Sequence, residues 1–125
     1  MYRRSLALAA LVLATACAGS TSFDVEGFPE IVLDPGSSDS VVLPLEAEGS
    51  HAGEFTITAE ATDGLSATVS PQAVEVNGVV DIEVTVTADD DAPAGYGSVQ
   101  VLAERTKGDI EASITVSVEV FEAGL

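Results

Sequence analysis

The sequence predicts an all-β protein: one antiparallel β-sandwich of about seven or eight strands that follows a short N-terminal signal segment. Three observations support this fold class. From about residue 20 onward, valine, isoleucine and threonine alternate with polar residues, turn residues recur at short intervals, and no segment favours a helix longer than one turn.

Residues 1–16 read as an export signal rather than as part of the fold. Arg3 and Arg4 make its start positive, an apolar stretch follows, and small residues at 14–16 allow peptidase access. The apolar run is about half the roughly 20 residues that a membrane-spanning helix needs. Removal of the signal leaves enough chain for one domain. It also leaves two cations against 21 acids, a formal charge of −19.

Cys17, the only cysteine, directly follows this segment. The run Leu13-Ala14-Thr15-Ala16-Cys17 resembles the lipobox of bacterial lipoproteins, which implies a lipid on Cys17 after cleavage, although leucine usually stands one place nearer the cysteine. Ala14-x-Ala16 also suits an ordinary signal peptidase, which would release a secreted protein. We favour the lipoprotein, exported and anchored to the cell envelope at an outer membrane or cell surface. Residues 17–27 would then be the lipidated cysteine and a flexible tether, about 30 Å long when extended.

The sandwich is expected over residues 28–122. Its strands are predicted where apolar residues alternate with polar ones, because a period of two places one face in a core. In chain order they fall at residues 30–33, 41–47, 55–61, 65–69, 73–76, 80–88, 99–103 and 110–120. Pro44 has no backbone donor for a ladder, which suggests an edge position or a bulge.

Turn residues separate these strands. Asn77-Gly78 is the strongest short hairpin signal in the chain, and it predicts that residues 73–76 pair with residues 79–82. Asp34-Pro35-Gly36, Asp63-Gly64 and residues 106–109 mark other reversals. A fold with this many short strands and turns is most naturally an immunoglobulin-like sandwich.

Several motifs resemble the immunoglobulin-like modules of exported bacterial and archaeal proteins, similar to NEW3-type and related β-sandwich domains. They are Leu33-Asp-Pro-Gly36, Gly53-Glu-Phe-Thr-Ile57, residues 63–71 and Ala92-Pro-Ala-Gly95. The resemblance implies a non-catalytic spacer or binding module. Such modules commonly carry an aromatic two residues after the glycine of the Pro-x-Gly turn, whereas here Gly97 stands there and Tyr96 comes one residue early. Tyr96 therefore points outward, or a bulge at residues 95–97 returns it inward.

The sequence contains two candidate sites. Asp89, Asp90 and Asp91 form the densest charge cluster, which suggests calcium because that ion takes six to eight oxygen ligands; a solvated acidic turn is the alternative. Tyr96 is a candidate contact for polysaccharide, because an exposed aromatic ring offers an apolar face. His51, in a loop, is expected to be solvated.

The sequence offers no nucleophile beside an evident base, no phosphate loop and no zinc spacing, so we expect neither an enzyme nor a bound cofactor. Its charge repels nucleic acids. We expect a monomeric, lipid-anchored structural or protein-interaction module of the cell envelope. Its partners would be the membrane, through the lipid on Cys17, and an envelope protein or polysaccharide. The alternative is a ligand-binding or adhesion domain that uses its end loops, with calcium, or Tyr96, with polysaccharide.

Overall fold

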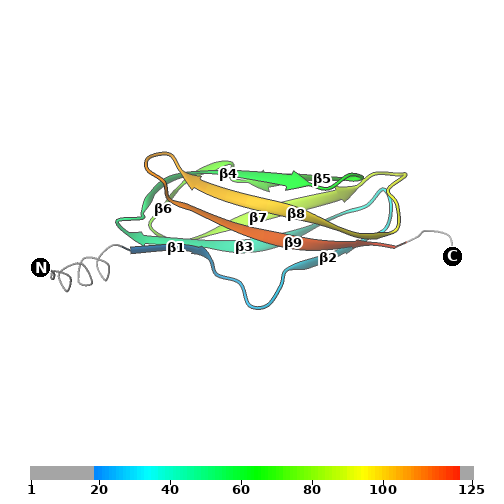
Figure 1. Cartoon of the computed structure of the whole chain (residues 1–125), viewed down its shortest axis with the longest axis horizontal. Coiled ribbons are helices and arrows are strands. Elements are labelled where there is room, and N and C mark those ends of the chain that lie inside the picture. Colours follow the sequence, from blue (N-terminus) through cyan, green and yellow to red (C-terminus); the bar gives the residue numbers. More distant parts are fainter. Residues whose placement is uncertain (1–18, 122–125) are drawn as a thin grey trace, which may run out of the picture.

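The computed structural model describes residues 19–121, so Cys17 and the predicted signal lie outside the described residues. Nine strands form two facing sheets (Figure 1). One sheet has the strand order β1-β3-β7-β5, and the other has the order β2-β9-β8-β4-β6. The prediction of an all-β, immunoglobulin-like sandwich is confirmed, with nine strands where about seven or eight were expected. Residues 19–121 contain no helix long and apolar enough to cross a membrane.

The eight predicted strands are all present near their expected positions, and β1 is the addition. The first sheet contains β1 (Gly19–Phe23), β3 (Ser38–Gly49), β5 (Leu65–Ser70) and β7 (Gly78–Ala88). The second sheet contains β2 (Glu30–Leu33), β4 (Gly53–Ala61), β6 (Ala73–Val76), β8 (Gly95–Arg105) and β9 (Glu111–Val120).

The core lies between the sheets and is formed by the inward residues of each alternating strand. Phe55 on β4, Ile82 on β7 and Val116 on β9 are fully buried, whereas the residues next to each of them on the same strand are exposed. Each such side chain contributes about 1.5–3 kcal/mol through burial. No polar or charged side chain is buried within residues 19–121. The described fold is therefore stabilised by apolar packing and backbone ladders.

The expected tether is in part a strand. Gly19–Phe23 form β1, which pairs antiparallel with β3 from Gly19 opposite Gly49 to Phe23 opposite Leu45. Phe23 packs against the core, and Thr21 Oγ1 is hydrogen-bonded to His51 Nδ1 at 2.7 Å. The sandwich therefore begins at residue 19 and not at residue 28, because these contacts outweigh a composition that favours a linker.

The expectation of a purely antiparallel sandwich is also corrected. β2 runs parallel to β9, with Glu30 opposite Ser117 and Leu33 opposite Val120. The loop after β1 carries the chain from the first sheet to the second, and a positive φ of 71° at Gly27 lets it turn there. β2 then continues in the direction of β1, which is also the direction of β9.

The predicted Asn77-Gly78 hairpin is wrong. β6 pairs with β4 in the second sheet, whereas β7 pairs with β3 and β5 in the first, so the chain changes sheet at this bend. A two-residue hairpin would place Val76 and Asp81 on one face and Glu75 and Ile82 on the other. The change of sheet lets Val76 and Ile82 both enter the core, where each is fully buried.

Pro44 lies in an interior strand, at a place where that strand is locally open. β3 lies between β1 and β7, but its last pair with β1 joins Phe23 to Leu45. The Pro44 carbonyl accepts a hydrogen bond from the backbone N–H of Asp24 at 2.9 Å. Because N and O of a strand residue point the same way, the missing donor of Pro44 faces the side that β1 leaves uncovered.

The two ends of the sandwich carry different sets of loops. The N-terminal end, where β1 begins, holds the turns at residues 49–53, 77–78 and 106–109. The C-terminal end, where β9 finishes, holds the loops at residues 34–37, 62–64 and 89–94 (Figure 1). β8 has 11 residues, which separates these ends by about 33 Å.

Candidate functional site

Tyr96 lies near the C-terminal end and points outward, with 80% of its side chain exposed. The ladder between β8 and β9 runs without interruption from Gly95 opposite Val120, through Tyr96 opposite Glu119, to Gly97 opposite Val118. No bulge therefore returns Tyr96 to the core. Of the two alternatives that the sequence left open, the outward one is confirmed.

Steric crowding at Gly97 explains why this chain has no aromatic side chain at the position where similar modules carry one. A Cβ atom at Gly97 would lie 2.6 Å from Thr62 Oγ1 and 2.9 Å from Leu65 Cδ1. Both distances are shorter than the contact of two non-bonded heavy atoms allows. Leu65, which packs against the core from β5, therefore occupies space that an inward side chain at position 97 would need.

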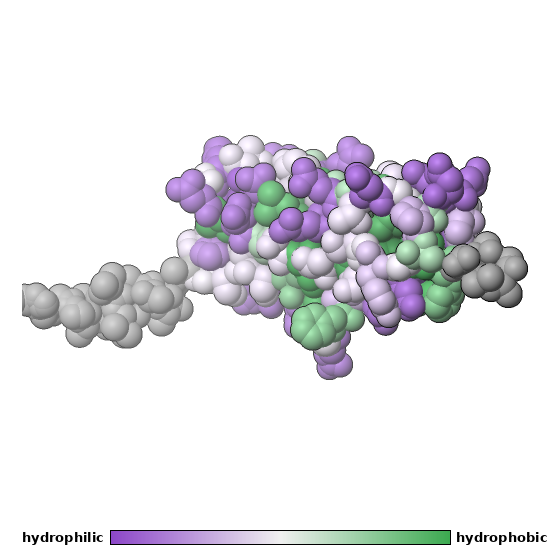
Figure 2. Space-filling model, turned by 45° about the vertical axis from the view of Figure 1, so that its right-hand side comes forward, coloured by the Kyte–Doolittle hydropathy of each residue, from purple (hydrophilic) through white to green (hydrophobic). Residues whose placement is uncertain are grey.

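An exposed apolar surface surrounds Tyr96. We define the Tyr96 patch as Val32, Tyr96 and Phe121, together with Glu119 between them. Val32 and Tyr96 are the two cross-strand neighbours of Glu119, and Phe121 follows Glu119 by two residues. Val32 is 45% exposed and Phe121 50% exposed. Figure 2 shows hydrophobic residues at the surface near the C-terminal end, among mostly hydrophilic neighbours.

A second exposed apolar group lies apart from this patch. Phe28 is 93% exposed in the loop between β1 and β2, which projects from the body of the sandwich (Figures 1 and 2). The following residue, Pro29, is fixed by its carbonyl, which accepts the N–H of Ser117 at 3.0 Å. Phe28 is thus displayed on the same edge of the second sheet as β2.

A hollow of about 330 Å³ adjoins Tyr96 at the C-terminal end. Its walls come from three loops and strand ends: Thr62, Asp63, Leu65, Ala92, Pro93, Ala94, Gly95, Tyr96, Gly97 and Val120. Ligand pockets that enclose a small molecule range from about 300 to 1,000 Å³, so this hollow is at the lower limit. Its size and the small residues that line it suit one inserted side chain or ring.

The aspartate loop lies at the same end as Tyr96 but does not form a metal cage. The backbone N–H of Asp89 donates to the Gly64 carbonyl at 2.9 Å, which joins this loop to its neighbour. Within residues 19–121, no three His, Cys, Asp or Glu side chains are grouped so as to hold a metal ion. The calcium hypothesis for Asp89, Asp90 and Asp91 therefore has no support from the described geometry.

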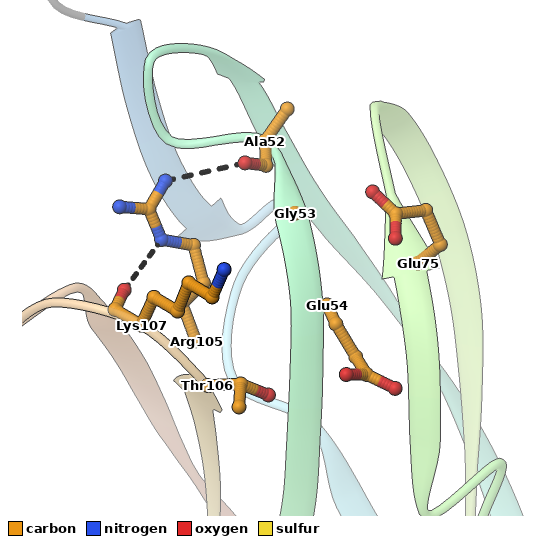
Figure 3. A pocket seen from close by; sticks show the side chains of 7 residues that line it. All are labelled: Ala52, Gly53, Glu54, Glu75, Arg105, Thr106 and Lys107. Atoms are coloured by element: carbon orange, nitrogen blue, oxygen red, sulfur yellow. Dashed lines mark hydrogen bonds between the residues drawn. The ribbon is translucent and has the colours of Figure 1, made fainter.

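A hollow of about 400 Å³ lies at the N-terminal end, beside Arg105 (Figure 3). Arg105 Nε donates to the Lys107 carbonyl at 2.7 Å, and Nη1 donates to the carbonyls of Ala52, at 3.2 Å, and Ser50. The guanidinium thus joins the turn at 49–53 to the turn at 106–109. Its hydrogen-bonding capacity is largely used by the protein itself.

Carboxylates crowd one another on the strands of the described sandwich. Glu54 on β4 lies directly opposite Glu75 on β6, a like-charge pair that opposes strand pairing. Glu46 has a raised pKa, chiefly because the charge of Glu48 is near, with further contributions from partial desolvation and from Asp24. Self-repulsion is therefore a local feature of this surface as well as a consequence of its net charge.

His51 is not the solvated loop residue that the sequence suggested. It is half-buried in the turn after β3, and its ring is bonded to Thr21 of β1. Its backbone N–H also donates to the Glu48 carbonyl at 3.1 Å. His51 therefore helps to hold β1 against the sandwich through its hydrogen bond to Thr21.

Comparison with known proteins shows the fold and nothing finer. No protein-family model matches the chain, and no curated protein does. A FixG-related protein from Vibrio parahaemolyticus superposes with a TM-score of 0.55 at 11% identity, over 68% of this chain and 80% of that one. A family 123 glycoside hydrolase from Clostridium perfringens gives 0.51 at 6% identity, over 78% of this chain and only 23% of the hydrolase.

Domains 4 and 5 of the S-layer protein SbsC give a TM-score of 0.48 at 16% identity, over 82% of this chain and 53% of that one. The two superpositions with TM-scores above 0.5 agree with the two-sheet sandwich described above, and at such identities they show only the fold of the chain. They assign no activity to it. The resemblance to NEW3-type modules stays an interpretation of the sequence, since no family model matches.

Sequence reasoning found Tyr96 but missed its neighbours. Val32 was placed only within a short strand, and Phe121, although it could point outward, was not predicted to lie beside Tyr96. The sequence did contain a signal for Phe121. The turn at 106–109 sets the register between β8 and β9, which places Tyr96 opposite Glu119 and so brings it near Phe121. The contribution of Val32 was not accessible in this way, since it depends on the long-range parallel pairing of β2 with β9.

Proposed function

We propose that the protein is a non-catalytic, lipid-anchored protein of the cell envelope whose single sandwich is a structural or protein-interaction module. The anchor would be Cys17, which directly follows the predicted signal. The protein would be a monomer held at an outer membrane or cell surface by this lipid. The observation that carries the interaction role is the Tyr96 patch, an exposed apolar surface on an otherwise acidic domain.

The composition of the patch favours a protein partner. Tyrosine is enriched where single residues dominate binding energy, because its ring is large and has few rotatable bonds. Glu119 lies between Val32 and Tyr96, so a partner that matches this surface presents apolar side chains around a lysine or arginine. The adjoining hollow can take one further side chain.

Site-specific cross-linking in intact cells tests the interaction role. A photoreactive amino acid at position 96 should cross-link to one defined envelope protein, whereas the same amino acid at position 102 should not. Leu102 is the matched control because it lies at the outer face of the same strand, toward the N-terminal end. A charge-reversing Glu119→Lys in the position-96 protein should abolish the product. Equal cross-linking from both positions would argue against the patch.

Mass spectrometry of the native N-terminus tests the anchor. The proposal expects a diacylated or triacylated Cys17 as the first residue. An unmodified thiol at Cys17, or a start at another residue, would make the protein a secreted domain instead.

The second candidate is a polysaccharide-binding or adhesion domain, which the hollow beside Tyr96 favours. Purified cell-wall polysaccharide should then retain the protein in a pull-down. Tyr96→Ala should abolish retention, and Tyr96→Phe should keep most of it, since stacking needs the ring and not the hydroxyl. Retention unaffected by Tyr96→Ala would exclude this site.

A further inference from the structure

We infer that the N-terminal end of the sandwich lies directly on the headgroups of the anchoring membrane, and that the aspartate loops and the Tyr96 patch point away from it. The inference rests on the proposed lipidation of Cys17 but goes further, because it fixes the orientation and height of the domain. Three features support it: the position of β1, the distribution of charge, and the bracing of the turns.

The first feature is the length of chain between the lipid and the fold. β1 begins at Gly19, two residues after Cys17, and two residues span at most about 7 Å. β1 is not free to detach as a linker, because it pairs with β3 over five residue pairs and Thr21 is bonded to His51. The tether of about 30 Å that the sequence suggested is therefore mostly absent.

The second feature is the contrast between the two ends. Arg105 and Lys107 are the only cations in residues 19–121, and both lie at the N-terminal end. In its turns, at residues 49–53, 77–78 and 106–109, the charges of Lys107 and Asp109 cancel, and the acids of this end stand on the adjoining strand ends: Glu48, Glu54, Glu75, Glu104 and Glu111. The loops of the C-terminal end carry five aspartates and no cation: Asp34, Asp63, Asp89, Asp90 and Asp91.

This contrast favours one orientation at an anionic surface. Such a membrane repels carboxylates close to it, and the effect falls off within a Debye length of about 8 Å. With the N-terminal end down, the five aspartates stand about 33 Å away, beyond several Debye lengths. A domain lying on its side would instead bring the glutamates of a sheet face within that range. The upright orientation therefore keeps the five loop aspartates out of range, and Arg105 and Lys107 offset part of the charge of the glutamates that border the N-terminal turns.

The third feature makes this end a firm surface. Arg105 donates to the carbonyls of Ser50, Ala52 and Lys107, and Figure 3 shows the last two of these bonds, so the turns on either side of Arg105 are held together. Lys107 itself is exposed. The partner that this end fits is thus a layer of lipid phosphates: Lys107 is free to approach them, and the small residues of the turn at 49–53 allow close contact.

Single-cysteine labelling measures the orientation. Lipidation leaves no free thiol on Cys17, so Ser50→Cys and Asp90→Cys each introduce the only reactive one; both positions are exposed. The native lipidated variants are labelled with a fluorophore and placed in vesicles of phosphatidylcholine and phosphatidylglycerol that contain a headgroup-linked nickel quencher. Quenching should be several-fold stronger at position 50 than at position 90. A long Gly/Ser insertion between Ala18 and Gly19 should reduce the difference.

The outcomes separate this inference from the proposed function. Equal quenching at the two positions, or stronger quenching at position 90, in protein shown by mass spectrometry to carry its lipid, overturns the orientation and leaves the anchor intact. An unlipidated Cys17 overturns both. Strong quenching at position 50 that the insertion does not reduce would also contradict the inference, because it would not depend on the short link to β1.

Discussion

Replacement of Gly97 by alanine should destabilise the sandwich through a steric clash and not through lost flexibility. The new methyl would lie 2.6 Å from Thr62 Oγ1 and 2.9 Å from Leu65 Cδ1. Overpacking of this kind costs about 1–3 kcal/mol. The lower half of that range is expected, because Leu65 is only half-buried and its end can move. Movement of Thr62 would also strain the bond that its Oγ1 accepts from the Ser98 N–H at 3.1 Å.

Double-mutant cycles in urea test this explanation. Leu65→Ala removes one of the two obstructing atoms, so Gly97→Ala should cost less in the Leu65→Ala background than in the wild type. Coupling between contacting residues is about 0.5–3 kcal/mol, whereas distant pairs add to within about 0.5 kcal/mol. Leu102→Ala serves as the matched control. It also truncates a leucine to alanine, but Leu102 lies on the outer face of β8, five residues from Gly97 on that strand.

Three results would refute the reasoning. The first is a free energy of unfolding that Gly97→Ala leaves unchanged. The second is full additivity of its effect with that of Leu65→Ala, and the third is equal coupling to Leu102→Ala. In any of these cases, close approach of Thr62 and Leu65 would not explain why glycine occupies this position.

The remaining predictions concern β1 and the charge of the surface. Thr21→Val should cost about 1 kcal/mol by removing the hydrogen bond to His51, whereas Thr21→Ser should retain most of the stability in urea titrations. Glu46 has a raised pKa, so the folded state binds its proton more tightly than the unfolded state does; wild-type stability should therefore rise as pH falls through the window above the ordinary glutamate pKa. Glu46→Gln should remove that rise and be the more stable protein at neutral pH; an unchanged pH profile of the melting temperature would argue against it. Because the charge is −19 without the signal, melting temperature should increase from dilute to molar sodium chloride, where the Debye length shrinks to about 3 Å; no increase would indicate that self-repulsion is negligible.

Local patterning predicted most of the strands in this chain. β7 and β9 alternate over their length, so burial of one face follows directly from the sequence. β1 was missed because Gly19-Ser-Thr-Ser22 has the composition of a linker. β1 is a strand because β3 extends as far as Gly49 and can pair with it. The extent of β3 depends in turn on its pairing with β7, which is distant in the sequence.

The errors share a physical cause, which is that pairing between distant segments outweighs local turn preference. Asn77-Gly78 has the residues of a hairpin turn, yet Val76 and Ile82 reach the core only from opposite sheets. The sequence itself showed that a two-residue hairpin would place Val76 and Ile82 on opposite faces of one sheet. This consideration should have outweighed the turn signal. The orientation of Tyr96, in contrast, depends on what fills the inner face at Gly97, and Leu65 comes from another sheet.

β1 and β2 are edge strands of different sheets, and this arrangement also determines how the domain would resist force. β1 starts at the N-terminal end and runs along β3, and β2 continues in the same direction beside β9. A pull on residue 18 away from the domain is directed along both strands. The five residue pairs between β1 and β3 are then loaded together in shear, so that several hydrogen bonds must break at once, whereas a pull across the strands would open them one at a time; β2 takes the load only after β1 has detached. The connection at Gly19 is therefore suited to bearing mechanical tension.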